Sequence, residues 1–68
     1  MISYDPLWHT LKIRGISTYK LRMDYNFSKG TLDRLKQGKN ITMETLNCLC
    51  EILECDICDV IEYRKDKK

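Results

Sequence analysis

The chain has 68 residues, which is room for one domain with a small core. Hydrophobic residues make up 43% of it and charged residues 32%, a balance typical of a compact soluble protein rather than a disordered one. No apolar run approaches the roughly 18 residues that indicate a membrane span, and the N-terminus lacks the basic head and apolar stretch of a signal peptide. We therefore expect a cytoplasmic protein that does not associate with membranes.

The net charge is only +2, but the charges are unevenly distributed along the chain. Residues 12–39 carry eight basic and two acidic side chains, whereas residues 40–62 carry six acidic side chains and no basic one. Residues 63–68 form a basic tail. A molecule polarised in this way can turn its basic half toward a polyanion. A solvated surface with chance clustering gives the same pattern, so charge alone does not identify a partner.

A local signal for the start of a helix occurs four times. It consists of an apolar residue, then Ser, Thr or Asp, then three further residues and a second apolar residue. The polar side chain accepts hydrogen bonds from the unpaired amides of the first helical turn, and the two apolar residues pack against each other. The capping positions are Ser17, Ser28, Thr42 and Asp56, and Asp5 followed by Pro6 adds a fifth start.

These starts predict an all-α fold of five short helices. Gly15, Asn26 and Gly38 tolerate left-handed backbone and are expected to end the first three helices. Strand signals are nearly absent, although Met1–Tyr4 is a candidate for a short extended segment. The helices are expected at about residues 6–14, 18–24, 29–37, 43–54 and 57–62.

The last two helices differ in how clearly their buried faces can be predicted. The fourth has apolar residues at the spacing of a buried stripe, namely Leu46, Leu49, Cys50 and Leu53. The fifth is short, and we expect it to bury Ile57, Val60 and Ile61.

Four cysteines fall within one window of 11 residues: Cys48, Cys50, Cys55 and Cys58. The successive C-x-C and C-x-x-C spacings raise the hypothesis of a metal site. Residues 48 and 50 would point about 200° apart around a helix, however, and the single histidine, His9, is distant in sequence. We therefore expect reduced structural cysteines and no metal or cofactor, with a metal site and inter-chain disulfides as the alternatives.

Between residues 17 and 37 a short capped helix, a brief turn and a second short helix with a basic outer face follow one another. This order is typical of a helix-turn-helix, whose second helix enters the DNA major groove. On these features the chain resembles the Cro and phage-repressor type (XRE-like) of DNA-binding domain over about residues 7–62. The residues that carry the resemblance are Ser17–Leu21, Asn26–Ser28, Leu32, Gly38–Lys39, Thr45–Leu53 and Asp59–Val60.

The resemblance implies a lambda-repressor-like helix-turn-helix domain over residues 1–68, with a core at about 5–62 and the basic tail at 63–68. It implies binding of double-stranded DNA, usually by a homodimeric repressor from a bacterium, a phage or a mobile element. Thr18 stands where many members have a glutamine that contacts phosphate. Lys36 stands where many have glutamate, which makes the expected DNA face more basic.

Lys29 and Arg34 are the leading candidates for base contacts, because Lys or Arg to guanine is the commonest specific contact in the major groove. Thr31 and Asp33 complete the expected base-contacting set. Gly30 would cost roughly 1 kcal/mol relative to alanine in an exposed helix interior, and we interpret it as clearance for DNA. Residues expected at the DNA backbone are Ser17, Thr18, Tyr19, Ser28, Lys36, Lys39 and Asn40.

The chain shows no catalytic constellation, and we expect neither enzymatic activity nor a small-molecule substrate. The expected dimer surface comprises Ile57, Val60, Ile61 and Tyr63, which exceed what one small core needs. The leading hypothesis is a sequence-specific transcriptional regulator, most often a repressor. The alternatives are a protein-interaction module with weak DNA binding, such as an antitoxin or co-regulator, and a thiol- or metal-responsive regulator.

Overall fold

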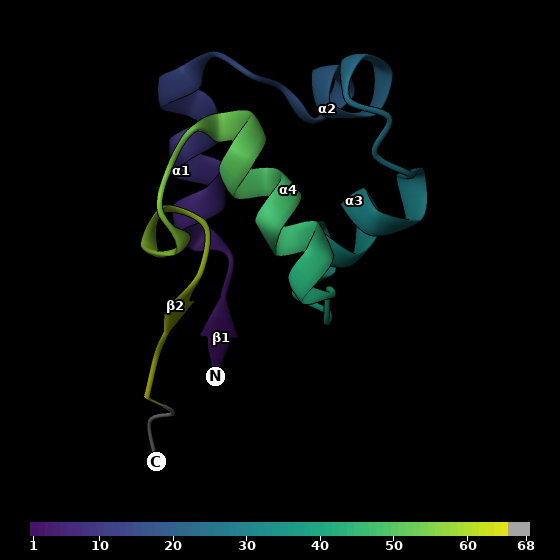
Figure 1. Cartoon of the computed structure of the whole chain (residues 1–68). Coiled ribbons are helices and arrows are strands. Elements are labelled where there is room, and N and C mark those ends of the chain that lie inside the picture. Colours follow the sequence, from purple (N-terminus) through teal and green to yellow (C-terminus); the bar gives the residue numbers. More distant parts are fainter. Residues whose placement is uncertain (66–68) are drawn as a thin grey trace.

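The computed structural model describes residues 1–65. Within them, four α-helices follow a short strand, and a 3₁₀ turn and a second short strand complete the fold (Figure 1). The elements in order are β1 (Ile2–Ser3), α1 (Asp5–Arg14), α2 (Thr18–Asp24), α3 (Lys29–Gln37), α4 (Met43–Leu53), the 3₁₀ helix η1 (Ile57–Asp59) and β2 (Glu62–Tyr63). No helix in this part of the chain is long and apolar enough to cross a membrane.

The starts of α2, α3 and α4 are confirmed as hydroxyl-capped. In each case the capping oxygen accepts a hydrogen bond from the amide three residues later, which satisfies one of the unpaired donors of the first turn. The bonds are Lys20 N to Ser17 Oγ at 3.1 Å, Thr31 N to Ser28 Oγ at 3.0 Å and Thr45 N to Thr42 Oγ1 at 3.1 Å.

The left-handed positions are also confirmed. Gly15 ends α1 with a φ of 67° and Gly38 ends α3 with a φ of 71°. Asn26, in the turn between α2 and α3, has a φ of 59°. The reversal that places α3 after α2 therefore depends on backbone conformations that few other residues adopt.

The prediction that Asp5 caps the first helix is wrong. Tyr4 occupies the capping position and its side chain makes no capping hydrogen bond, whereas the Asp5 amide donates to the Ser3 Oγ at 3.2 Å. The Asp5 carboxylate instead forms an ion pair with Arg64 at 2.8 Å. Asp5 thus joins the beginning of the chain to its C-terminal segment.

The prediction of a fifth α-helix at 57–62 is also wrong. Only Ile57–Asp59 forms a 3₁₀ turn, and Glu62–Tyr63 pairs antiparallel with Ile2–Ser3, so that the expected N-terminal extended segment is confirmed as a strand. Ile2 lies opposite Tyr63 and Ser3 opposite Glu62. Branched and aromatic side chains at Val60, Ile61 and Tyr63 suit a strand better than a helix, once a partner strand is available.

A single apolar cluster forms the core. Its centre includes the predicted stripe of α4, with Leu46, Leu49 and Leu53 buried and Cys50 half-buried against it. The residues that precede the four caps, Ile16, Phe27, Ile41 and Cys55, are half-buried against the same cluster. The buried apolar residues are Tyr4, Leu7, Leu11, Leu21, Leu32, Leu35, Leu46, Leu49, Leu53 and Val60.

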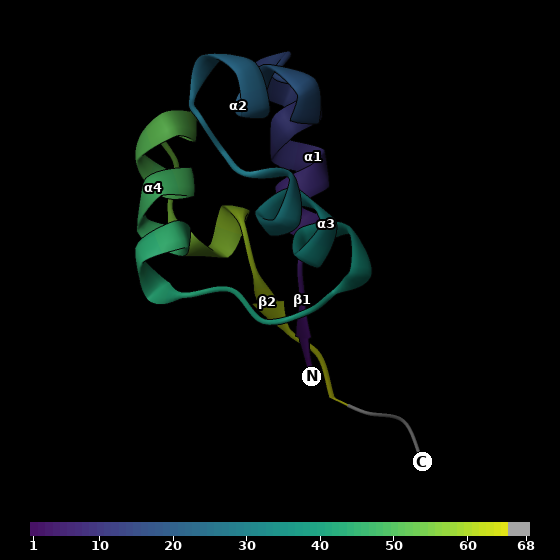
Figure 2. The same cartoon turned by 90° about the vertical axis from the view of Figure 1, so that its right-hand side faces the viewer.

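Side-chain hydrogen bonds to distant carbonyls connect the elements. The Tyr4 hydroxyl donates to the carbonyl of Lys39 at 2.7 Å, in the loop that crosses from α3 to α4 past the strands (Figure 2). The Thr10 hydroxyl donates to the carbonyl of Asp59 at 2.6 Å and so fixes η1 to α1. The loop after α3, which presents Lys39, is therefore held by the N-terminal segment.

Candidate nucleic-acid interface

Helices α2 and α3 border one shallow hollow on the molecular surface. It brings together the predicted residues Thr18 and Tyr19, from the first turn of α2, with three from α3. Arg22 also lines the hollow and was missed by the sequence analysis, although it lies one helical turn after Thr18 and therefore on the same face. The lining residues are Thr18, Tyr19, Arg22, Lys29, Leu32, Asp33 and Lys36.

Two parallel stripes of α3 face outward. The residues at i, i+4 and i+7 that border the hollow are Lys29, Asp33 and Lys36. One position further around the helix lie Gly30, Arg34 and Gln37, all exposed. The opposite side buries Leu32 and Leu35 in the core, so both stripes are available to an external partner.

The structure separates Thr31 from the other predicted base contacts. Its hydroxyl lies 2.8 Å from the hydroxyl of Ser28, and the two form one local network at the start of α3. Thr31 is half-buried and borders a different hollow, shared with Thr45 and Cys48 of α4. Ser17 and Ser28 act as caps, so their hydroxyls are already engaged with amides of the protein.

Lys39 and Asn40 follow α3 with exposed side chains. The Lys39 amide donates to the carbonyl of Arg34 at 2.8 Å, and its carbonyl accepts the bond from the Tyr4 hydroxyl. Its backbone is therefore held on both sides while its ammonium group faces solvent. This arrangement suits a cation that meets a phosphate at the end of α3.

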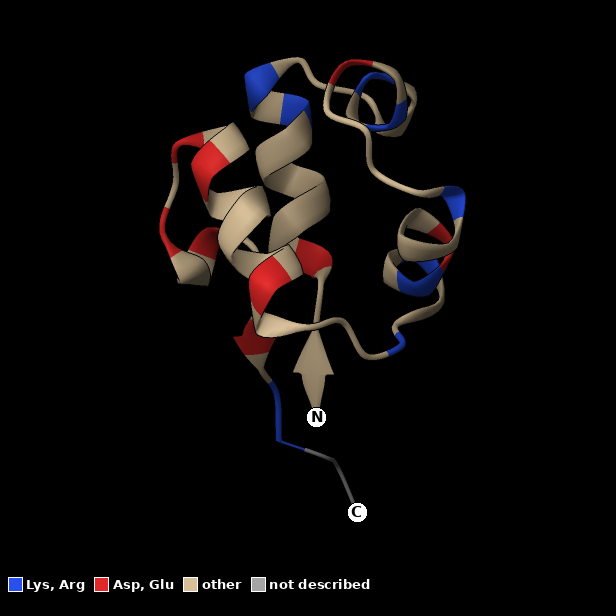
Figure 3. Ribbon diagram, turned by 45° about the vertical axis from the view of Figure 1, so that its right-hand side comes forward, with Lys and Arg blue, Asp and Glu red and all other residues tan. Residues whose placement is uncertain are grey.

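The charges of the sequence separate in space (Figure 3). Lys and Arg concentrate on α2, α3 and the end of α1, whereas Asp and Glu concentrate on α4, η1 and β2 (Figure 3). Within residues 1–65, Lys29, Arg34 and Lys36 form no ion pair, not even with the neighbouring Asp33. The cations of α3 are therefore available to an external anion.

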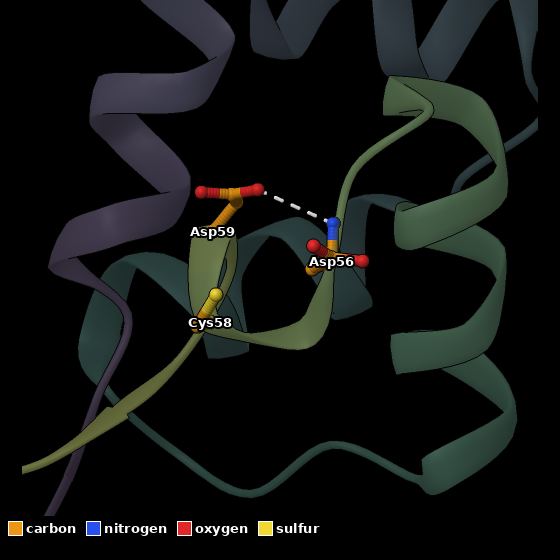
Figure 4. Close-up of side chains that lie close together, drawn as sticks. All are labelled: Asp56, Cys58 and Asp59. Atoms are coloured by element: carbon orange, nitrogen blue, oxygen red, sulfur yellow. Dashed lines mark hydrogen bonds between the residues drawn. The ribbon is translucent and has the colours of Figure 1, made fainter.

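The cysteines do not assemble into one site. Among the described residues, one group of three potential metal ligands occurs, formed by Asp56, Cys58 and Asp59, all exposed and with ligand atoms within 4.8 Å of one another (Figure 4). The Asp59 carboxylate accepts a hydrogen bond from the Asp56 amide at 3.2 Å, so a helix-capping role accounts for its position.

Cys50 and Cys55 lie together at the end of α4. Glu54 ends α4 in the left-handed conformation. The Cys55 amide, which follows it, donates to the carbonyl of Cys50 at 3.1 Å, a hydrogen bond typical of such a helix end. Burial raises the pKa of the Cys55 thiol, and the adjacent Cys50 thiol adds to that shift. Both side chains are half-buried against the core, which supports a structural role.

The predicted dimer surface needs one correction. Val60 is fully buried, with 0% of its surface exposed, so it belongs to the core and is not accessible to a second chain. Ile57 and Tyr63 are exposed, and Ile61 is half-buried. The basic tail begins at the end of β2, and its Arg64 forms ion pairs with Asp5 and Glu62. Its last residues, 66–68, lie outside the described part of the chain.

Two short capped helices at a left-handed turn, with a cationic outer face on the second, define a helix-turn-helix protein. The chain belongs to the Cro/C1-type helix-turn-helix DNA-binding domain family, whose model matches residues 6–66. It is 36% identical over 56 residues to the uncharacterized HTH-type transcriptional regulator YozG of Bacillus subtilis (strain 168), covering 79% of this chain and 67% of that protein. It also superposes on the crystal structure of the transcriptional regulator VanUg with a TM-score of 0.82, at 36% identity, over 90% of this chain and 81% of VanUg.

Proposed function

We propose that the protein is a transcriptional regulator that binds double-stranded DNA sequence-specifically, with α3 in the major groove. The observation that carries the proposal is the exposed face of α3, where Lys29, Arg34 and Lys36 form no ion pair within the described residues and stand away from the acidic half of the molecule. The names of the relatives YozG and VanUg, both described as transcriptional regulators, support a role in regulation.

In this proposal Lys29, Asp33 and Arg34 face the base edges. Thr18, Tyr19, Lys36, Lys39 and Asn40 contact the backbone, together with the newly found Arg22. Ser17 and Ser28 cap α2 and α3 by accepting amide hydrogen bonds, and Thr31 shares a hydroxyl hydrogen bond with Ser28. In this proposal Ser17 and Ser28 lie beside the DNA backbone, and Thr31 supports the start of α3. Contacts to the phosphates position the protein, while contacts to the base edges specify the sequence.

We propose further that the protein acts as a homodimeric repressor in the cytoplasm, by occupying DNA that polymerase needs. Two copies would read paired half-sites separated by one helical turn, about 34 Å, or a multiple of it. The wide exposure of α3 and the reduced state of the cysteines in such a compartment are compatible with this role.

Selection of bound duplexes from a random DNA pool tests the proposal. We expect an enriched motif, and affinity for it that falls roughly a hundredfold or more between about 50 and 200 mM salt, because each phosphate contact releases counterions. Absence of any enriched motif, with binding that depends little on salt, would instead favour a protein-interaction module.

Gly30 allows stability and DNA binding to be separated. A Cβ atom at this position would meet one neighbour within 4 Å, the Ser28 Oγ at 3.9 Å, which is an ordinary contact. We therefore expect Gly30→Ala to raise the free energy of unfolding by about 0.5–1 kcal/mol, since alanine favours the helix. The same substitution should weaken binding to the selected DNA site if Gly30 lies against the groove.

Thermal unfolding and fluorescence anisotropy measure the two effects on the same preparation. The matched control is Gln37→Ala, on the same exposed stripe near the end of α3. It changes a side chain on this surface but adds no atoms between the helix and the DNA. Unchanged DNA affinity in Gly30→Ala would show that Gly30 is not a point of close approach.

A further inference from the structure

The side chain of Tyr4 links the start of the chain to the loop between α3 and α4. Tyr4 follows β1 directly, and its carbonyl accepts a hydrogen bond from the Leu7 amide at 2.9 Å in the first turn of α1. Its backbone is therefore held between the strand pair and a helix. Its hydroxyl donates to the carbonyl of Lys39, 35 residues further along the chain, at 2.7 Å.

The ring of Tyr4 is enclosed on the inner side of this loop. Tyr4 is 8% exposed and belongs to the core cluster. It borders two hollows, one shared with the end of α3 at residues 35–38 and the other with the loop and the start of α4 at residues 40–43. A buried tyrosine hydroxyl usually has one hydrogen-bond partner, and the packing of the ring directs this hydroxyl to the loop.

The two peptide groups that flank the Cα atom of Lys39 are both hydrogen-bonded. The Lys39 amide donates to the carbonyl of Arg34 at 2.8 Å, at the left-handed end of α3, and the Lys39 carbonyl accepts from Tyr4. Because peptide groups are planar, fixing both of them fixes the two backbone torsions of Lys39. The direction of the Cα–Cβ bond follows from these torsions, so the exposed side chain leaves the loop from a defined position.

We propose that Tyr4 is a positioning residue for DNA binding, which orders the loop so that the Lys39 ammonium group meets a phosphate. Tyr4 itself does not contact the DNA in this arrangement, because its side chain is buried. Since the loop is already ordered in the free protein, binding does not have to carry the entropy cost of ordering it. The inference rests on the proposed function, in which Lys39 contacts the DNA backbone.

A second hydrogen bond of the same kind lies away from the proposed interface. The Thr10 hydroxyl in α1 donates to the carbonyl of Asp59 in η1 at 2.6 Å, and it too joins segments that are far apart in the sequence. The 3₁₀ turn η1 belongs to the acidic half of the molecule (Figure 3). Loss of this bond should therefore affect stability without affecting the loop after α3, which makes Thr10 a matched control for Tyr4.

The test compares Tyr4→Phe with Thr10→Val in their affinity for the selected DNA site. Each substitution removes one hydroxyl group, nearly preserves the shape of the side chain and should lower stability by a similar amount. We expect Tyr4→Phe to weaken DNA binding about three- to tenfold, and Thr10→Val to weaken it less than about twofold. Fluorescence anisotropy well below the melting temperatures of both variants measures the two affinities.

A double-mutant cycle with Lys39→Ala shows whether Tyr4 acts through Lys39. In that background Tyr4→Phe should weaken binding less than about twofold further, because the contact that it positions is already lost. Each lost phosphate contact also lowers the slope of log K against log salt concentration by about 0.9. The slope of Tyr4→Phe should therefore move from the wild-type value toward that of Lys39→Ala, a change that reduced stability alone does not produce.

Amide hydrogen exchange, measured by NMR without DNA, reports the order of the loop directly. The Lys39 amide should exchange about three- to tenfold faster in Tyr4→Phe than in Thr10→Val, because its bond to the Arg34 carbonyl loses the support of the neighbouring anchor. Equal exchange rates in the two variants would show that the Tyr4 hydroxyl does not order the loop.

The inference would also be overturned by wild-type DNA affinity in Tyr4→Phe, by equal losses in Tyr4→Phe and Thr10→Val, or by fully additive losses in the double variant. Each of these results is obtained with a wild type that binds its site, so the role of α3 would be unaffected. If the wild type selects no DNA site at all, the proposed function is contradicted and the inference with it.

Discussion

Leu49→Ala is expected to lower the free energy of unfolding by about 2–5 kcal/mol, because it removes a fully buried side chain and leaves a cavity. A core this small supplies a net stability of only about 3–5 kcal/mol, so the variant should be largely unfolded or melt far below the wild type. Leu49 lies in the middle of α4, between Leu46 and Leu53 of the same buried stripe. Urea titration followed by circular dichroism measures the loss.

Met43→Ala is the matched control for this experiment. Met43 belongs to the same helix and loses a side chain of similar size, but it is 81% exposed. Its replacement should change the free energy of unfolding by no more than about 0.5 kcal/mol. Equal destabilisation by the two substitutions would show that α4 does not pack as described.

Lys29→Ala and Arg34→Ala are expected to weaken binding to the selected DNA site by about 1–3 kcal/mol each, a loss of roughly five- to 150-fold. Each removes a long donor side chain from an exposed stripe of α3, where no ion pair within the described residues competes for it. Base preference should relax at one position of the site, because the lost contact specifies a base. Binding curves on single-base variants of the site measure both effects.

The matched control is Lys12→Ala, which removes the same charge from the exposed surface of α1. It should weaken binding to all sequences by a similar, small factor and leave base preference intact. If Lys29→Ala and Arg34→Ala behave like Lys12→Ala, then α3 does not read the sequence.

Local chemistry predicted the helix-turn-helix well. The caps Ser17, Ser28 and Thr42 act on amides only three residues away, so short-range patterns contain all the necessary information. The left-handed turns at Gly15 and Gly38 are equally local. The family, predicted from the resemblance of these residues to the Cro and phage-repressor type, is confirmed.

What the sequence did not predict depends on partners far along the chain. The segment after Asp56 begins with a helical capping signal, but residues 62–63 become a strand because Ile2–Ser3 lies beside them. Asp5 was predicted to cap the first helix, but its carboxylate forms an ion pair with Arg64. Val60 was predicted to lie on a dimer surface, but it is buried in the core.

The candidate site shows the same division. The outward stripes of α3 follow from helical periodicity, so Lys29 and Arg34 were placed correctly on an exposed face. The hollow between α2 and α3, however, depends on how the two helices pack. Its lining includes Arg22, which was not among the predicted site residues. Thr31, predicted as a base contact, lies toward Ser28 and α4, an orientation that depends on the same packing.

The separation of charge between the two halves of the molecule has a kinetic consequence. With a net charge of only +2, the protein feels little overall attraction to a polyanion, but the field of DNA exerts a torque on it. The acidic half, on α4, η1 and β2, is repelled while the half with α2 and α3 is drawn inward (Figure 3). We therefore expect encounter complexes to form with α3 already facing the DNA. A molecule that approaches with its acidic half toward the DNA is expected to dissociate before it binds the duplex.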